Sequence, residues 1–449
     1  MGPPFRRAGV LGVRLISAQW VLPVSVPPIR DGAVLVEGDR IVAVGTLAQL
    51  DASAPPETTR EHFDGCVLTP GLVNAHTHLT LTALAGVVPP APFAEWLPSL
   101  VAAMKPWEIE DHEASGVIGA EESLLAGVTV VGDIAYGTAE VASASRAGLG
   151  GVYYWELLGI HAEQITAELA RLRYPADPAK YGPRVVCGLS PHSPYTSGPE
   201  LLRAVHDTAG ELRVPVAIHI AESQAELDVL RDGSGPLSQV ATRTAFGFTP
   251  PGTGTVPYLA SLGALVATTA VHVCHVSPQD IEVLTHTARG IVTCPRSNRY
   301  LSNPVPQIAP FLAAGVPVGV GTDSSASNHD LDLLAEIREL RDAERGLSPE
   351  ALLAIATLGG AEAIGVDEGF GSLEPGKFAD LTVFDIVVVD DEPARAVVQS
   401  GGRRTVRAVM SGGVWRVADG CLLVTDHGAA RRGAHATAVA HSALGTDSA

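Results

Sequence analysis

Histidine and carboxylate side chains recur in this sequence directly after short apolar runs. His76 and His78 form an HxH pair, and His219 and Asp323 each follow a later run. Alternate residues of a strand point to the same side, so the HxH pair directs two imidazoles one way. Together these residues offer three neutral nitrogens and one carboxylate, a donor set suited to Zn²⁺ or Fe²⁺. The pattern predicts a metal site.

Further polar residues occupy the same kind of position, namely His192, Glu222 and His272. One histidine of this kind is more often a satisfied structural residue, and an HxH pair alone is a weak signal. Here the polar residues recur at the ends of successive runs, which favours a catalytic site. Glu222 follows His219 by three residues and is therefore close enough to relay protons there.

The apolar runs belong to alternating strand-like and helix-like segments between residues 66 and 369. The strand-like runs are CVLTPGLVNAH, VTVVGDI, GGVYYWELLG, RVVCGLSPH, PVAIHIAES, TTAVHVCHVS, IVTCPRSN and PVGVGTDSS. Runs this apolar are typical of strands buried on both faces. Eight such units predict an α/β fold, a (β/α)₈ TIM-type barrel, whose active site lies at the carboxyl ends of the strands.

Both ends of the chain carry short β-type runs separated by Gly, Pro and Asp. We expect residues 1–65 and 370–425 to pair into a small β-sandwich domain that flanks the barrel of residues 66–369. Residues 426–449, rich in Ala, Gly, Arg and His, are expected to form a disordered tail. Arg14 and Gln19 interrupt the first apolar run, which favours a strand over a secretory signal.

The composition excludes several classes of partner. The 449 residues include 49 acidic and 30 basic ones, for a formal net charge of −19, which disfavours nucleic acid and anionic membranes. No stretch approaches the roughly 20 apolar residues of a membrane span. Five scattered cysteines without CxxC spacing indicate a reduced, cytoplasmic protein. We expect a small-molecule substrate, and a homodimer is an open possibility.

The motifs around these residues resemble those of the amidohydrolase superfamily over almost the whole chain. The motifs are TPGLVNAHTHL (69–79), LSPHSPYT (189–196), IHIAES (218–223), VHVCHVS (271–277), TCPRSN (293–298), GTDSSASN (321–328) and GSLEPGKFADLTVFD (371–385). They are similar to the nucleobase and nucleoside deaminase branch, and most similar to 6-aminodeoxyfutalosine deaminases.

The resemblance implies roles for the central residues. One divalent ion, Zn²⁺ or alternatively Fe²⁺, would be bound by His76, His78, His219 and Asp323. Glu222 would shuttle protons, Asp323 would also accept a proton from water, and His272 would hold the hydrolytic water. His275 is the alternative to His272, which fits the spacing better. Relatives with two ions bridge them by a lysine at the end of strand four, whereas Lys180 precedes that strand, so one ion is expected.

The resemblance also suggests substrate contacts. The candidates are His192 for the purine, Trp96 for stacking, Glu108 for ribose hydroxyls, and Arg296 and Asn298 after strand seven. Structural roles remain open for several of them: Asn298 could cap a helix, and Trp96 could anchor its loop. Residues 231–238 are Gly-rich and form either a lid or an ordinary loop.

The expected reaction is hydrolytic deamination of an adenine-type nucleoside, best represented by conversion of 6-aminodeoxyfutalosine to futalosine in menaquinone biosynthesis. Guanine, adenosine, adenosylhomocysteine, other aminated heterocycles and halogenated triazines are alternatives with the same metal chemistry. A non-catalytic scaffold of this fold would lack metal ligands, whereas all four are present. The other zinc deaminase fold requires P-C-x-x-C, which the single Cys294 beside Pro295 does not provide.

Overall fold

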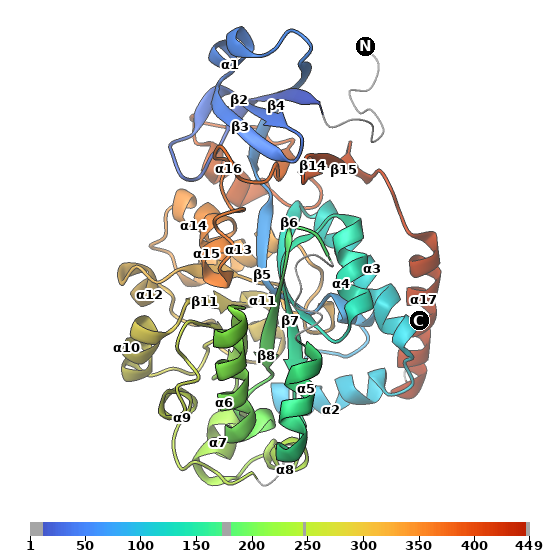
Figure 1. Ribbon diagram of the computed structural model, residues 1–449, viewed down its shortest axis with the longest axis vertical. Helices are drawn as coiled ribbons and strands as arrows, with labels where there is room; N and C mark the ends of the chain where they lie inside the picture. The colour runs from blue at the N-terminus through green and yellow to red at the C-terminus, as the bar shows by residue number, and fades with distance from the viewer. Residues whose placement is uncertain (1–11, 173–180, 246–247, 446–449) are drawn as a thin grey trace.

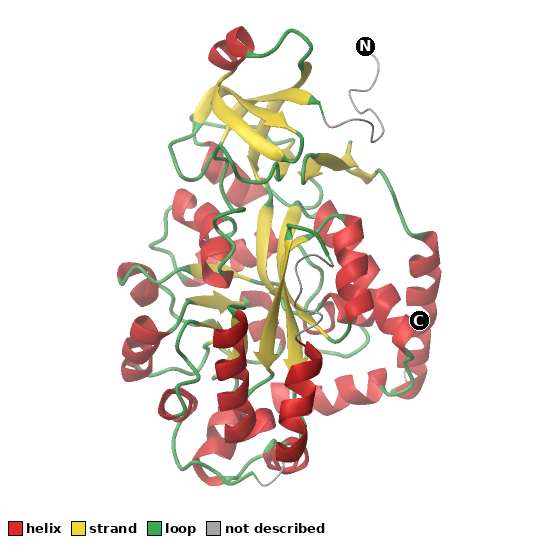
Figure 2. Cartoon of the chain, viewed as in Figure 1, coloured by secondary structure: helices red, strands yellow, loops and turns green. Residues whose placement is uncertain are grey.

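The chain forms two eight-stranded sheets, one of which is surrounded by helices while the other lies at one end of the molecule (Figures 1 and 2). The computed structural model describes residues 12–172, 181–245 and 248–445. Within these ranges, no helix has the length and apolar character needed to cross a membrane.

The larger sheet is a parallel barrel, which confirms the predicted fold. Its strands lie in chain order: β5 (Leu72–Thr77), β6 (Val128–Ala135), β7 (Gly150–Leu157), β8 (Val185–Pro191), β9 (Val216–Ile220), β10 (Thr268–His272), β11 (Gly290–Thr293) and β12 (Val318–Val320). A parallel bridge between Thr77 and Asp323 joins the two edges. The closure brings the end of the first strand, with His76 and His78, next to Asp323 after the last strand.

Helices follow the barrel strands and cover the outside of the barrel (Figure 2). After the first strands they are η1 (Leu79–Leu84), α2 (Phe93–Met104), α3 (Ile109–Leu125), α4 (Thr138–Ala147), η2 (Ala162–Gln164), α5 (Ile165–Leu172) and α6 (Pro194–Leu212). The later ones are α7 (Gln224–Asp232), α8 (Ser238–Thr244), α9 (Thr255–Ser261), α10 (Pro278–Thr287), α11 (Pro295–Tyr300), α12 (Ala309–Ala313), η4 (Ser325–Ser327), α13 (Leu333–Ala343), α14 (Pro349–Ile355) and α15 (Leu358–Ile364).

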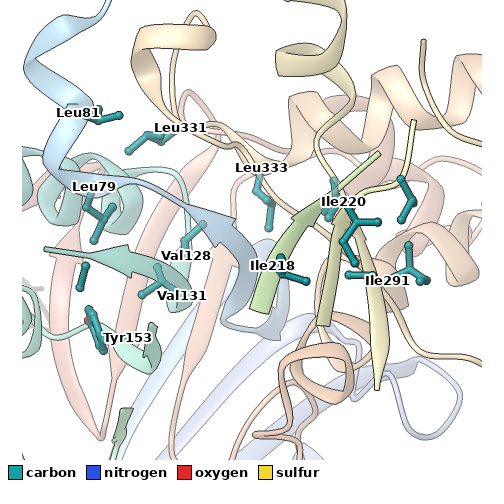
Figure 3. Packing of buried hydrophobic residues seen from close by; sticks show 14 of the residues in the cluster. Leu79, Leu81, Val128, Val131, Tyr153, Ile218, Ile220, Ile291, Leu331 and Leu333 are labelled. Atoms are coloured by element: carbon teal, nitrogen blue, oxygen red, sulfur yellow. The ribbon is translucent and has the colours of Figure 1, made fainter. Parts of the chain in front are cut away.

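The strand residues alternate between two apolar cores. On β9, Ile218 and Ile220 pack outward against the helices, as Figure 3 shows, whereas Ala217 faces the barrel interior. On β7, Val152 and Tyr154 likewise face the interior. This two-residue period places every second side chain inside the barrel, so inward residues at the carboxyl ends of the strands meet above the interior core.

The smaller sheet combines both ends of the chain. It consists of β1 (Val13–Val21), β2 (Ile29–Glu37), β3 (Arg40–Thr46), β4 (Thr59–Pro70), β13 (Leu381–Phe384), β14 (Val406–Ser411), β15 (Val414–Ala418) and β16 (Cys421–Leu422). Helices α1 (Leu47–Ser53) and α16 (Pro393–Ser400) lie between its strands in sequence. One apolar core joins residues from both ends, such as Ile16, Val34 and Met410.

The small sheet continues beyond residue 65, because β4 runs to Pro70. The apolar run CVLTPGLVNAH therefore divides between the two sheets at Gly71. A side chain at Gly71 would overlap that of Thr129 at the edge of the barrel, so only glycine fits this crossing. Residues 1–11 of the predicted small domain lie outside the described residues.

The prediction of a disordered tail over 426–449 is wrong for most of that segment. Helix α17 (His427–Ala443) begins at Asp426, whose side chain accepts hydrogen bonds from the amides of Gly428 and Ala429. It packs against α2 and α3, as Figure 1 shows. The indole Nε1 of Trp107 donates to Ala436 O at 3.0 Å. Alanine is the best helix former, which explains why this composition folds once a core is offered. Residues 446–449 lie outside the described residues.

Candidate active site

The structure brings the four predicted metal ligands together at the carboxyl end of the barrel. His76 lies near the end of β5, and His78 directly precedes η1. His219 lies on β9, and Asp323 follows β12. Nitrogens of His76, His78 and His219 lie within 4.8 Å of one another. Asp323 Oδ1 is 3.5 Å from Nε2 of His76 and 3.4 Å from Nε2 of His78. Three imidazoles and one carboxylate thus converge on one point.

His272 joins this cluster through an unusual backbone conformation. On β10, Val271 faces the barrel interior and Ala270 faces the helices, so simple alternation would turn His272 outward. His272 and Val273 instead have φ of 72° and 47°. This left-handed turn directs the imidazole inward, with its ring centroid 5.5 Å from those of His76 and His219. Such strain is typical of functional sites.

Hydrogen bonds fix which atoms of the cluster face its centre. His219 Nδ1 lies 2.7 Å from His192 O and donates to it, which leaves Nε2 free to bind a metal. His272 Nδ1 lies 3.1 Å from Asn298 Oδ1 and donates to it in the same way.

Two serine hydroxyls fix the orientation of the Asp323 carboxylate. Its Oδ2 accepts hydrogen bonds from Ser297 Oγ at 2.6 Å and Ser327 Oγ at 2.7 Å. The two hydroxyls leave Oδ1 turned toward the imidazoles of His76 and His78. Each ligand therefore presents one defined atom to the centre.

The unpartnered atoms of the cluster fit a divalent ion. His76 Nε2, which faces Asp323, is buried and has no hydrogen-bond partner in the part of the chain that the structure describes. Leaving such atoms unpaired is costly, and a metal bond is the usual remedy for a buried imidazole. Burial lowers the pKa of His78 to about 3 and of His272 to about 4, so both rings are neutral. Neutrality suits His78 as a metal ligand and leaves His272 able to accept a hydrogen bond.

The site contains two buried carboxyl groups whose pKa values move apart. Burial, with the nearby carboxyls of Asp323 and Glu226, raises the pKa of Glu222 well above its usual range. Burial also opposes ionisation of Asp323, but the adjacent imidazoles of His76 and His78 hold its pKa well below the usual range. One carboxyl is thus suited to hold a proton and the other to carry charge.

The backbone around Glu222 is clamped by a third carboxyl group. Glu226 accepts hydrogen bonds from the amide of Ala221 at 2.8 Å and the amide of Glu222 at 3.0 Å. Ala221 itself has φ of 50°, so the clamp holds a left-handed turn in place. The Glu222 carboxyl is then 3.9 Å from His272 Nε2.

The structure adds Glu156, which sequence reasoning missed. A carboxylate oxygen of Glu156, on β7, and nitrogens of His192 and His219 lie within 4.8 Å of one another. Glu156 continues the inward alternation of Val152 and Tyr154 and ends it at the barrel rim. That two-residue period at the end of GGVYYWELLG is the signal that could have identified it.

His275 lies outside the cluster, and the predicted substrate contacts Asn298 and Arg296 make hydrogen bonds or ion pairs within the protein. His275 donates its backbone amide to Ala221 O at 2.9 Å, and no group of candidate ligands among the described residues includes it. Asn298 bonds His272 and does not cap a helix. The guanidinium of Arg296 pairs with Asp330 at 2.7 Å, which ties it to the loop after η4.

The side chains of two further predicted substrate contacts, Trp96 and Glu108, lie away from the cluster. Trp96 lies on α2 and packs, 4 % exposed, in the outer apolar core, so it anchors this segment as the alternative interpretation held. The Glu108 side chain is 70 % exposed and pairs with Arg432 of α17 at 2.9 Å. The structure does not bring Glu108 into the cluster, because it begins α3 on the outside of the barrel.

Residues 231–238 join the end of α7 to the start of α8, and Gly233 ends α7 with φ of 76°. Whether this segment closes over the site stays a prediction of the sequence.

Comparison with known proteins agrees with this architecture. The profile of the Amidohydrolase family matches residues 67–416, and that of an imidazolonepropionase-like composite domain from bacteria matches residues 32–55. The 5-methylthioadenosine/S-adenosylhomocysteine deaminase of Moorella thermoacetica is 31 % identical over 84 % of this chain and 86 % of its own. The aminodeoxyfutalosine deaminase of Deinococcus radiodurans is 33 % identical over 74 % of this chain and 81 % of its own.

A solved structure gives the same result in three dimensions. The crystal structure of an adenosine deaminase from Xanthomonas campestris with bound zinc superposes with a TM-score of 0.82 at 25 % identity. The superposition covers 96 % of this chain and 99 % of that one.

Proposed function

This chain belongs to the amidohydrolase family, and we propose that it is a metal-dependent deaminase that hydrolyses the 6-amino group of an adenine-type nucleoside. The observation that carries this proposal is the convergence of three imidazoles and Asp323 beside the buried pair of Glu222 and His272. The first set suits a divalent ion, and the second suits proton transfer.

One divalent transition ion would be held by His76, His78, His219 and Asp323, and we propose that it is Zn²⁺. When bound, such an ion lowers the pKa of a coordinated water to about 7 and so supplies hydroxide at neutral pH. The hydroxyls of Ser297 and Ser327 hold one oxygen of Asp323, so the carboxylate cannot rotate away from the imidazoles.

Glu222 carries protons through the deamination. Its raised pKa favours the protonated carboxyl, which can donate to the N1 nitrogen of the purine as oxygen adds to C6. The carboxylate formed in that way accepts one proton of the added water and delivers it to the departing amine. The C6–N bond then breaks and ammonia leaves, while the second proton of the added water returns to Glu222 and the oxygen stays on C6 as a carbonyl.

His272 orients the attacking water. Because its Nδ1 donates to Asn298, the Nε2 atom carries a lone pair and can accept a hydrogen bond from that water. The Nε2 atom is 3.9 Å from the Glu222 carboxyl, so both groups face one reacting centre.

Within this class we propose 6-aminodeoxyfutalosine as the substrate. The similarity of the strand-end motifs and the 33 % identity to the Deinococcus relative support this choice. The Moorella relative supports methylthioadenosine or adenosylhomocysteine as the alternative. All of these share the adenine base and ribose, and they differ in the 5′ substituent.

Ammonia release tests both levels of the proposal. The zinc-loaded protein is assayed with 6-aminodeoxyfutalosine, adenosine, methylthioadenosine, adenosylhomocysteine, guanine and a chlorinated triazine, the last scored by chloride release. We expect the highest kcat/KM for 6-aminodeoxyfutalosine. Another adenine nucleoside that exceeds it by about tenfold, a difference of about 1.4 kcal/mol in transition-state binding, would overturn the substrate alone. Turnover of guanine or the triazine only would overturn the proposed function.

A further inference from the structure

Glu156 is a buried carboxyl group for which the proposed reaction has no use. One of its oxygens, Oε1, is shielded from solvent and has no hydrogen-bond partner among the described residues. Tyr136 makes a hydrogen bond to the same carboxyl group, and burial raises the pKa of Glu156 to about 7. In its ionised form the carboxyl can only accept hydrogen bonds, so Oε1 still lacks a donor. Unpaired acceptors at this depth are rare in proteins and call for a specific explanation.

Glu156 lies on the more exposed side of the site. Along the rim, Glu156 on β7 is followed by His192 after β8, then His219 on β9 and His272 on β10. His76 and His272 are 1 % exposed, whereas Glu156 and His192 are only half-buried. Glu156 and His192 are therefore the more exposed side of this row, which favours the approach of a ligand to the metal ligands across them.

The orientation of His192 supports this direction of approach. Its Nδ1 lies 2.8 Å from Thr196 Oγ1 and 3.1 Å from Ser193 Oγ, so the other nitrogen, Nε2, is turned away from these hydroxyls. A nitrogen of His192 and a carboxyl oxygen of Glu156 thus lie within 4.8 Å of each other, and Oε1 of Glu156 has no hydrogen-bond partner among the described residues.

The donors of an adenine nucleoside identify what Glu156 can bind. Such a molecule has two kinds of donor, the amine at C6 and the hydroxyls of the sugar. The proposed function, on which this argument rests, directs the amine toward Glu222 and His272 on the far side of His219. The sugar hydroxyls are then the donors left for a carboxylate on β7. A carboxylate that accepts from ribose hydroxyls is a common device in nucleotide recognition.

We infer that Glu156 is a specificity-determining residue that accepts a hydrogen bond from a ribose hydroxyl and so selects ribonucleosides over deoxynucleosides. It takes the place that the sequence suggested for Glu108, whose side chain points away with Arg432. The inference predicts recognition of the sugar on the β7–β8 side of the rim.

Equilibrium binding tests the inference without turnover. Inosine, 2′-deoxyinosine and 3′-deoxyinosine are titrated into the wild-type zinc-loaded protein and its Glu156→Ala, Glu156→Gln and Glu108→Ala variants by calorimetry. Wild-type protein should bind inosine about 10- to 100-fold more tightly than at least one deoxy analogue, the usual effect of a hydrogen bond to a charged group. Glu156→Ala should reduce this ratio to within about threefold by weakening inosine, and any analogue that keeps the contacted hydroxyl, while the affinity of the analogue that lacks this hydroxyl stays unchanged.

The variants distinguish recognition from a structural role. Glu156→Gln keeps one acceptor oxygen and should retain part of the ratio, and Glu108→Ala should match wild type. An unchanged ratio in Glu156→Ala, an equal loss for all three nucleosides, a reduced ratio in Glu108→Ala, or no nucleoside binding by wild type would each overturn the inference. Ammonia release is scored separately: discrimination between the sugars without deamination would contradict the proposed function and leave the role of Glu156 standing.

Discussion

The amino end of the barrel is filled by apolar side chains, whereas the carboxyl end is filled by buried polar ones. At the amino end, Ile364 and Ala363 of α15 pack against interior residues such as Val73 and Val292. Gly290 allows this approach, because a side chain there would lie 2.5 Å from the Cα of Ala363. The result is an ordinary close-packed core.

The carboxyl end departs from regular structure at several points. Ala221, His272 and Asp323 all have left-handed φ, between 50° and 72°, at or within three residues of the ends of their strands. Each costs on the order of 1–3 kcal/mol, and the unpaired imidazole nitrogens add to the cost. The contrast separates the region that stabilises the fold from the region that performs the reaction. Substitutions at the carboxyl end should therefore lower activity, and substitutions at the amino end should lower the free energy of unfolding.

The largest effect is expected from the metal ligand His219 and the proton carrier Glu222. His219→Ala should lose both the metal and the activity. Glu222→Gln should keep the metal and lose about 10²–10⁴-fold in kcat, the usual contribution of general acid–base catalysis. Parallel metal analysis and steady-state kinetics measure both. Normal turnover by Glu222→Gln would remove it from the mechanism.

The next effect separates the two histidines after β10. His272→Asn should lower kcat by about 10²-fold, because the lone pair that faces the water is removed. His275→Asn, the matched control, should be nearly silent, since His275 lies outside the cluster. The reverse ranking in the same assay would transfer the catalytic role to His275.

At the amino end we expect loss of stability with activity intact. Ile364→Ala removes a fully buried side chain and should lower the free energy of unfolding by about 2–5 kcal/mol. Its kcat/KM at 25 °C should equal that of wild type. Denaturant unfolding measures the first quantity. A large fall in kcat/KM with unchanged stability would erase the distinction between the two ends.

The smallest effect concerns α17, which lies against the segments that follow β5. Trp107→Phe removes the hydrogen bond to Ala436 O and keeps an aromatic ring, so it should cost about 0.5–1.5 kcal/mol. Hydrogen exchange should show faster opening of His427–Ala443 in this variant. If α17 exchanged as rapidly in wild type as an unfolded peptide, its docking would be contradicted.

Much of this architecture was predictable because its signals are local. Eight apolar runs predicted the barrel, and the polar residues at their ends predicted the cluster of His76, His219 and Asp323. The resemblance and its spacing favoured His272 over His275, and His272 lies in the cluster, although alternation alone would have turned it outward. The left-handed φ that reverses it depends on neighbouring strands, and no single run encodes it.

The failures have similar causes. The tail composition suggested disorder, although Asp426 as a helix cap before an Ala-rich segment was readable. The resemblance suggested that Glu108 binds ribose hydroxyls. In the structure its carboxylate pairs instead with Arg432, which is more than 300 residues later in the sequence. Glu156 lies in none of the motifs that carry the resemblance, and the pairing of β7 with β8 brings it beside His192.

Metal content tests the central claim most directly, namely that the polar end of the barrel is a single-ion centre. Elemental analysis of the purified protein should find about one transition-metal ion per chain, as three imidazoles and one carboxylate imply. Glu222→Gln should contain the same amount and His219→Ala very little. Two ions per chain, or full deaminase activity in protein that contains none, would contradict the account.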